Sequence, residues 1–139
     1  VKLISSGAKR LGLQIVDAGV GNAEEYNAEI GLADRVLCDV PCAGLGIIGR
    51  KPEIRYKSLE NIDNLPLLQY NILTNASRYL KVNGTLVYST CSLNPEENDE
   101  VVLKFVNENN GFKLLSSETV MPHLNDSDGF FIAVLTRTE

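Results

Sequence analysis

Two cysteines of this chain stand at positions where a thiol could do chemistry. Cys42 follows the apolar run ADRVLCDVP, and Cys91 follows a second apolar run, GTLVYST. A thiolate is a nucleophile, and Asp39 places a carboxylate close to the first of these cysteines. One such cysteine alone would favour a packing role, but two of them, one beside an aspartate, favour nucleophilic catalysis. The third cysteine, Cys38, lies inside the first run and is expected to fill space in the core.

The segments around these residues alternate between helix and strand. Apolar periodicity predicts helices over residues 2–11, from Pro66 onward and from Pro95 onward. Strands are predicted at residues 13–18, 33–39, 84–90, 112–118 and 129–137. No long helix separates the last two strands, so they should be antiparallel. This order predicts an α/β, doubly wound sheet that is mostly parallel and ends in an antiparallel pair.

Such a sheet binds its ligands at the carboxyl ends of its strands. Asp39 and Cys42 follow one predicted strand, and Cys91 follows another. If these two strands are neighbours, they lie about 4.8 Å apart. Their end loops would then share one pocket.

The last two helices carry more detailed expectations. The helix from Pro66 should bury an apolar stripe formed by Leu67, Leu68, Ile72, Leu73, Ala76 and Leu80. In the next helix, Asn94 is the expected N-cap and Glu97 occupies the capping-box position. A helix amino end beyond Cys91 would favour its thiolate, whereas Glu96 and Glu97 would oppose it. The protonation state of Cys91 therefore stays open at this point.

The composition argues against several classes of protein and of site. A formal net charge of −5 argues against a protein that coats nucleic acids. The apolar runs are far shorter than the roughly 18 residues of a membrane span. Three cysteines without a CxxC pair, and the single histidine His123, predict neither a disulfide framework nor a metal site. These features favour a reducing, cytoplasmic location.

One local segment departs from the acidic balance. GRKPEIRYK, residues 49–57, carries four basic residues and one glutamate, which gives 4 − 1 = +3. The basic residues are Arg50, Lys51, Arg55 and Lys57. By charge alone, this segment is either a solvated loop or a contact for phosphate groups.

A glycine pattern in the same region invites a different interpretation. GLGIIG, residues 44–49, matches the GxGxxG of dinucleotide-binding proteins. That motif needs a strand leading directly into the first glycine and a helix opening on the last. Here Cys42 and Ala43 intervene, and Pro52 blocks a helix soon after Gly49. The dinucleotide interpretation is therefore the weakest of those considered.

The two cysteine segments together resemble a known family. DRVLCDVPCAGLGIIGRKPEIRYK and GTLVYSTCSLNPEEND resemble the RNA (cytosine-5) methyltransferases, in particular their Sun-like bacterial branch, which modifies small-subunit ribosomal RNA. The family pattern combines D-x-P-C-S-G-x-G, a basic R-x-P-[DE]-I-x-[WY] segment and T-C-S followed by P-E-E-N. Ala43 replaces the usual serine, Tyr56 takes the aromatic position, and DGFF at residues 128–131 resembles the closing motif. The resemblance covers the whole chain and implies a Rossmann-like class I methyltransferase fold.

The resemblance also implies roles for individual residues. Cys91 would be the nucleophile that adds to carbon 6 of cytosine and so activates carbon 5 toward the methyl group of S-adenosylmethionine. Cys42 would assist release of the covalent adduct, and Asp39 would contact ring nitrogen 3 of the base or the cofactor. Asp17 and Pro41 would contribute to the cofactor site. The target base must be unpaired or flipped out, and the basic segment would hold its backbone.

Several parts of the family pattern are absent from these residues. The glycine-rich cofactor loop and the acidic residue that holds the ribose are missing, as are the first two strands. We therefore expect residues 1–139 to be the carboxyl-terminal portion of one catalytic domain, with little affinity for S-adenosylmethionine. Because the missing strands would flank it, the strand at 13–18 should find a new partner, swap between molecules or be disordered. The alternative from another class is a catalytically silent module that binds RNA or protein.

Overall fold

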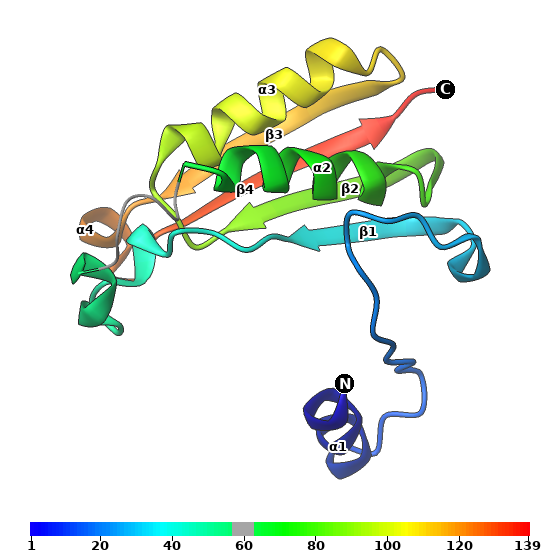
Figure 1. The fold of residues 1–139 in the computed structure, drawn as a ribbon, viewed down its shortest axis with the longest axis horizontal. Helices are drawn as coiled ribbons and strands as arrows, with labels where there is room; N and C mark the ends of the chain where they lie inside the picture. Colours follow the sequence, from blue (N-terminus) through cyan, green and yellow to red (C-terminus); the bar gives the residue numbers. More distant parts are fainter. Residues whose placement is uncertain (57–62) are drawn as a thin grey trace.

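The structure, a computed structural model, describes residues 1–56 and 63–139, and its centre is a four-stranded mixed sheet (Figure 1). The strands are β1 (Ala33–Asp39), β2 (Leu80–Thr90), β3 (Phe112–Val120) and β4 (Phe130–Arg137). They lie in the order β1-β2-β4-β3. β1 and β2 are parallel, whereas β4 runs antiparallel to both β2 and β3. The predicted α/β fold and the predicted antiparallel pair at the end of the chain are confirmed, but the described strands form one parallel and two antiparallel pairs, so this sheet is mixed and not mostly parallel as predicted.

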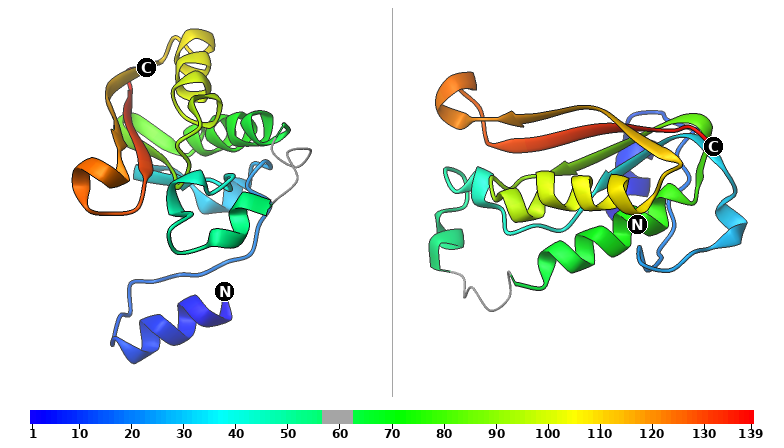
Figure 2. Two further views of the ribbon diagram at one scale, coloured as in Figure 1. Left: turned by 90° about the vertical axis from the view of Figure 1, so that its left-hand side faces the viewer. Right: turned by 90° about the horizontal axis from the view of Figure 1, so that it is seen from above.

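Two long helices cover one face of this sheet. Helix α2 (Leu65–Ser77) connects β1 to β2, and helix α3 (Asp99–Glu108) connects β2 to β3. Figure 2 shows both helices on the same side of the strands. The remaining helices are α1 (Lys2–Arg10) and the single turn α4 (Pro122–Asn125), with short 3-10 turns at Ala28–Ile30, Leu45–Ile47, Pro52–Tyr56 and Pro95–Glu97. No described helix is long and apolar enough to cross a membrane.

The hydrophobic core lies between the sheet and these two helices. Alternate residues of the two central strands point into it, because side chains alternate between the faces of a strand. The fully buried members include Leu73, Leu86, Tyr88, Phe105, Phe131 and Leu135. Cys38 belongs to the same cluster, as expected for a core residue, and burial raises its pKa to about 12.

The apolar stripe predicted for α2 is only partly right. Leu73 is fully buried, but Leu67 is 59% exposed. Gln69 and Asn75 take buried positions on this helix instead. Both polar side chains donate hydrogen bonds to backbone carbonyl groups of loops. Gln69 donates to Pro41 O, and Asn75 donates to the carbonyl oxygens of residues 23 and 25. Hydrogen bonding therefore decides which face of α2 is buried, in addition to hydrophobicity.

The predicted strand at residues 13–18 is wrong. These residues are irregular and pair with no described strand. Together with α1 they form an amino-terminal segment, residues 1–21, which lies apart from the sheet (Figure 1). A single strand without a partner leaves its backbone groups unpaired and is not stable in water, which explains the difference.

The chain returns to the body of the molecule just after this segment. Asn75 Nδ2 donates to Ala23 O at 2.8 Å and to Glu25 O at 3.0 Å. The ring of Tyr26 stacks on that of Tyr79, with centroids 4.9 Å apart. Residues 22–27 thus pack against the end of α2 and the residues that follow it. The part of the chain that lies away from the sheet ends before them.

Candidate active site

Cys42 and Cys91 meet at the carboxyl end of β1 and β2. The parallel register pairs Asp39 with Ser89, so the two strands end side by side. The Sγ atoms of the two cysteines lie 2.9 Å apart, and both side chains are partly buried. The sequence-based prediction that these strands are neighbours is confirmed, and the two thiols share one site.

The two thiols share a hydrogen bond, in which either sulfur can be the donor by geometry. Burial raises the pKa of Cys42 to about 12, and the hydrogen bond to Cys91 and the charge of Cys91 contribute to this increase. At neutral pH the Cys42 thiol therefore keeps its proton and can donate a hydrogen bond to the Cys91 sulfur.

Asp39 is the last residue of β1, the strand that precedes Cys42, and its side chain faces solvent. Its carboxylate is exposed, and Oδ1 accepts a hydrogen bond from Ser89 Oγ at 2.9 Å. Ser89 stands opposite Asp39 on the neighbouring strand, so β2 orients the carboxylate of β1. This carboxylate is available to a ligand that brings its own donor.

The remaining expected cofactor residues lie at or near an open cavity. Asp17 and Asp39 both border a cavity of about 1060 Å³, with Val20 and Leu37 as apolar parts of its wall. Pro41 is exposed, and its carbonyl oxygen accepts a hydrogen bond from Gln69 Nε2. Carboxylates and apolar surface in one cavity suit an adenosyl group, which carries hydroxyls, an amine and an apolar ring face. The residues present therefore fit S-adenosylmethionine in kind.

A buried carboxyl group, Glu97, lies at the centre of the loops that carry the cysteines. Its Oε2 accepts hydrogen bonds from Ala43 N at 2.8 Å and from Gln69 Nε2 at 3.0 Å. Its Oε1 accepts from Ser92 Oγ at 2.7 Å. The capping-box role expected for Glu97 is therefore wrong, although Asn94 does accept from Glu96 N as an N-cap should. A glutamate near a helix start is normally exposed, so nothing in the sequence except its place near Ser92 pointed to this contact.

Further buried hydrogen bonds shape the turn around Cys91. Thr90 Oγ1 donates to Asn98 Oδ1 at 2.6 Å, and Asn98 Nδ2 donates to Ser92 O at 3.0 Å. The Tyr88 hydroxyl donates to the Glu97 carbonyl at 2.6 Å. Because of this turn, Pro95–Glu97 is a 3-10 turn and α3 begins at Asp99, later than expected. The amino end of the helix is thus further along the chain from Cys91 than the sequence suggested.

Backbone contacts connect this turn to two other loops. Gly46 N donates to Cys91 O at 2.9 Å, and Gly129 N donates to Gly46 O at 2.8 Å. A Cβ atom on Gly46 would lie 2.0 Å from Gly129 O, so only glycine fits there. Gly46 of GLGIIG therefore allows close packing of loops, and no helix opens at Gly49. The dinucleotide interpretation is wrong.

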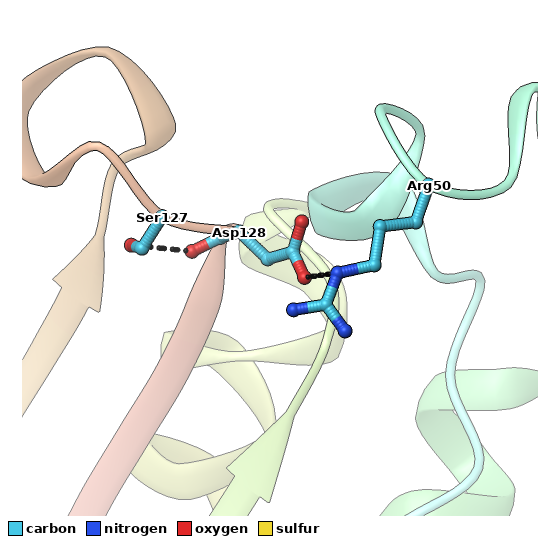
Figure 3. Close-up of polar contacts among 3 residues, drawn as sticks. All are labelled: Arg50, Ser127 and Asp128. Carbon is cyan, nitrogen blue, oxygen red and sulfur yellow. Dashed lines mark hydrogen bonds and ion pairs between the residues drawn. The ribbon is translucent and has the colours of Figure 1, made fainter.

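The basic segment is joined to the same end of the sheet. Figure 3 shows Arg50 directed at Asp128, with Nε 2.6 Å from a carboxylate oxygen. The Arg50 side chain nevertheless stays 77% exposed, while that of Asp128 is 14% exposed. Lys51 and Arg55 are exposed, and Lys57 lies outside the described residues. Residues 1–56 and 63–139 contain no cluster of His, Cys, Asp or Glu that could hold a metal ion.

Comparisons with known proteins agree with this geometry. Residues 1–136 match the sequence model of the family described as 16S rRNA methyltransferase RsmB/F. The chain is 39% identical to ribosomal RNA small subunit methyltransferase B of Photorhabdus laumondii and 37% identical to the probable enzyme of that name in Bacillus subtilis. In both cases the match covers 99% of the chain but only 34% and 35% of the relative, so the chain spans about a third of their length.

Solved structures give the same picture for the fold. The structure called PH0851 superposes with a TM-score of 0.93 at 34% identity, over 98% of this chain and 34% of that one. NSun6 from Pyrococcus horikoshii, solved with SFG, gives 0.87 at 28% identity, over 99% and 38%. The sheet is therefore part of a Rossmann-like class I methyltransferase fold, whose members take the methyl group from S-adenosylmethionine. The chain belongs to the 16S rRNA methyltransferase RsmB/F family.

Proposed function

We propose that this chain is the carboxyl-terminal portion of the catalytic domain of a cytoplasmic enzyme that methylates carbon 5 of a cytosine in small-subunit ribosomal RNA. The observation that carries the proposal is the pair of thiols, 2.9 Å apart, at the ends of two adjacent parallel strands. The family and the two bacterial relatives support ribosomal RNA as the substrate. The thiol pair supports the position on the base, because cytosine carbon 5 reacts only after a nucleophile has added to carbon 6.

In this proposal the two sulfurs have different tasks. Cys91 forms a bond to carbon 6, which makes carbon 5 nucleophilic. S-Adenosylmethionine supplies the methyl group that carbon 5 takes. A base, such as water, then takes the proton from carbon 5, and the electrons of that bond re-form the double bond between carbons 5 and 6. The bond between carbon 6 and sulfur breaks, and its electron pair leaves with Cys91. The Cys42 thiol, whose sulfur lies 2.9 Å from that of Cys91 and whose pKa is raised by burial, donates a hydrogen bond to the departing thiolate and so assists release.

The neighbouring residues hold the reactants in this proposal. Asp39, oriented by Ser89, accepts a hydrogen bond from the base or from the cofactor. Asp17, which borders the cavity, and Pro41 contribute to the cofactor site. The exposed basic residues of the segment 49–57 contact RNA phosphates, and Arg50 does so while its Nε stays paired with Asp128.

The test is mass spectrometry of small-subunit ribosomal RNA from a strain that lacks the full-length gene. We expect the loss of 5-methylcytosine at one position or a few positions, and its return when the gene is restored. If every 5-methylcytosine remains, the alternative of a silent module that binds RNA or protein is favoured. If another modification disappears instead, the enzyme acts on a different atom and the role of the thiol pair must be revised.

A further inference from the structure

Glu97 is a fully buried carboxyl group that the chemistry of the two thiols does not require. Neither ion pair found among the described residues involves it. A buried carboxyl group without hydrogen bonds is destabilising, so the partners of such a group reveal what it organises. All three partners of Glu97 are neutral donors: a backbone N–H, an amide and a hydroxyl.

Two of the three donors belong to the residues that directly follow the two cysteines. Ala43, which offers its N–H to Oε2, directly follows Cys42. Ser92, which offers its hydroxyl to Oε1, directly follows Cys91. One carboxyl group thus bridges the two loops on equivalent sides of the reactive residues.

The third donor strengthens the same bridge from the helix side. Gln69 Nε2 donates to Glu97 Oε2 at 3.0 Å and also to Pro41 O at 2.9 Å. Pro41 directly precedes Cys42, so the Cys42 loop is held on both sides of the cysteine. Gln69 and Glu97 are both fully buried, so water does not compete with these bonds.

We propose that Glu97 is the positioning residue that holds the Cys42 loop against the Cys91 loop and so sets the distance between the two thiols. Glu97 touches neither sulfur and acts only through the residues that follow the cysteines. The consequence for catalysis rests on the proposed function, but the bridge can be tested without any methylation.

A glutamine at position 97 should preserve the bridge, whereas an alanine should abolish it. In Glu97→Gln the amide oxygen can accept from Ala43 N and Gln69 Nε2, and the amide nitrogen can donate to the Ser92 hydroxyl, which is both donor and acceptor. Glu97→Ala removes every acceptor and leaves the Ala43 N–H buried without a partner. The two variants therefore show whether the hydrogen bonds of the side chain at position 97, and not its charge, hold the two loops together.

The experiment measures thiol proximity in the full-length protein with a short bis-alkylating reagent that fluoresces only after it has reacted with two thiols. Cys42→Ser provides the background. A misplacement of about 1 Å can cost roughly a hundredfold in rate, so we expect Glu97→Ala to slow crosslinking of Cys42 to Cys91 at least about tenfold. Glu97→Gln should stay within about threefold of the unmodified protein. Crosslinking of Glu97→Ala at the unmodified rate, or of Glu97→Gln as slowly as Glu97→Ala, would overturn the proposal.

Two milder variants cover the case in which Glu97→Ala does not fold. Ser92→Ala and Gln69→Leu each remove one donor, and circular dichroism establishes that they fold. Each should slow crosslinking about threefold. This factor is smaller than the change in an equilibrium that the loss of one buried hydrogen bond can cause. Unchanged crosslinking in both variants would overturn the proposal.

Methylation assays on the same proteins keep this inference distinct from the proposed function. If the protein methylates cytosine, Glu97→Ala should lower kcat while the KM for RNA stays within about twofold, because Glu97 orients the thiols and does not bind RNA. If the unmodified protein methylates nothing but crosslinks as described, the proposed function fails and the bridge stands. If methylation occurs and Glu97→Ala changes neither kcat nor crosslinking, the bridge fails and the function stands.

Discussion

The cysteine end of the sheet, where β1 and β2 lead to Cys42 and Cys91, and the amino-terminal segment, residues 1–21, differ in how many of their polar and apolar groups have partners within the described residues. At the cysteine end, loops from three parts of the chain are joined by backbone hydrogen bonds through Gly46, and a buried carboxyl group has three donors. In the amino-terminal segment, α1 buries no residue, and Ile15 and Val20 are 91% and 92% exposed. Among the described residues, the two thiols therefore lie in a hydrogen-bonded and partly buried setting, whereas apolar residues of the amino-terminal segment face solvent.

Replacing each cysteine in turn tests the proposed chemistry at the cysteine end, and it carries the largest expected effect. In the full-length protein, Cys91→Ala should abolish methylation because no nucleophile remains. Cys42→Ala should leave protein bound covalently to RNA, because release loses its assistance. Denaturing gel electrophoresis with labelled RNA detects the adduct. If Cys42→Ala releases RNA normally and Cys91→Ala accumulates the adduct, the two roles are reversed.

The amino-terminal segment carries Asp17, so the affinity for S-adenosylmethionine tests whether this segment forms part of a working cofactor site. Residues 1–139 alone should bind S-adenosylmethionine at least about a hundredfold more weakly than the full-length protein, a difference of about 2.8 kcal/mol. The physical reason is that the glycine-rich loop and the ribose-binding acid of the family pattern are missing from residues 1–139, and Asp17 and Asp39 alone cannot replace their polar contacts. Calorimetric titration of both proteins measures the difference. Micromolar binding by residues 1–139 would contradict this expectation.

Adding one methyl group to a glycine in each region should have opposite effects. Gly46→Ala would place Cβ 2.0 Å from Gly129 O and should destabilise the fold by about 2–3 kcal/mol. Gly7→Ala in α1 meets no atom within 4 Å and should stabilise that helix by up to about 1 kcal/mol. Denaturant unfolding followed by circular dichroism compares them.

A control for the glycine experiment lies within the same motif. A Cβ atom on Gly49 would meet no atom within 4 Å, so Gly49→Ala should be nearly neutral. Equal destabilisation by Gly46→Ala and Gly49→Ala would show that the loop contacts at the cysteine end are looser than described.

The smallest expected effect separates two arginines of the basic segment. Reversing Arg55 to Glu should make the negative slope of log affinity for RNA against log salt concentration shallower by about one unit, if this side chain contacts a phosphate. Arg50→Glu should have the same effect on the slope and should also lower protein stability, because Arg50 is paired with Asp128. RNA binding at several salt concentrations, together with thermal unfolding, measures both. An unchanged slope in both variants would show that the segment is only solvated.

The sequence is sufficient to predict the features that depend on local pattern. The apolar runs before Asp39 and Cys91 are strands, and because both end at the same edge of the sheet, the two thiols meet as predicted. The strand predicted at 13–18 fails because a strand depends on a partner, which no local pattern supplies. The capping-box prediction for Glu97 fails for a related reason: its donors at Ala43 and Gln69 are distant in sequence, so their contact depends on the fold.

The hydrogen bond between Ala43 and Glu97 also bears on the order in which the molecule folds. It joins residues 54 positions apart, whereas the bonds within α2 and α3 join near neighbours in the chain. Closing a long loop costs entropy that is recovered only after the strands on either side have paired, so distant contacts form late. The thiol pair should therefore assemble after the helices and the β1–β2 ladder. On gentle heating, thiol proximity should be lost at a lower temperature than the helical signal.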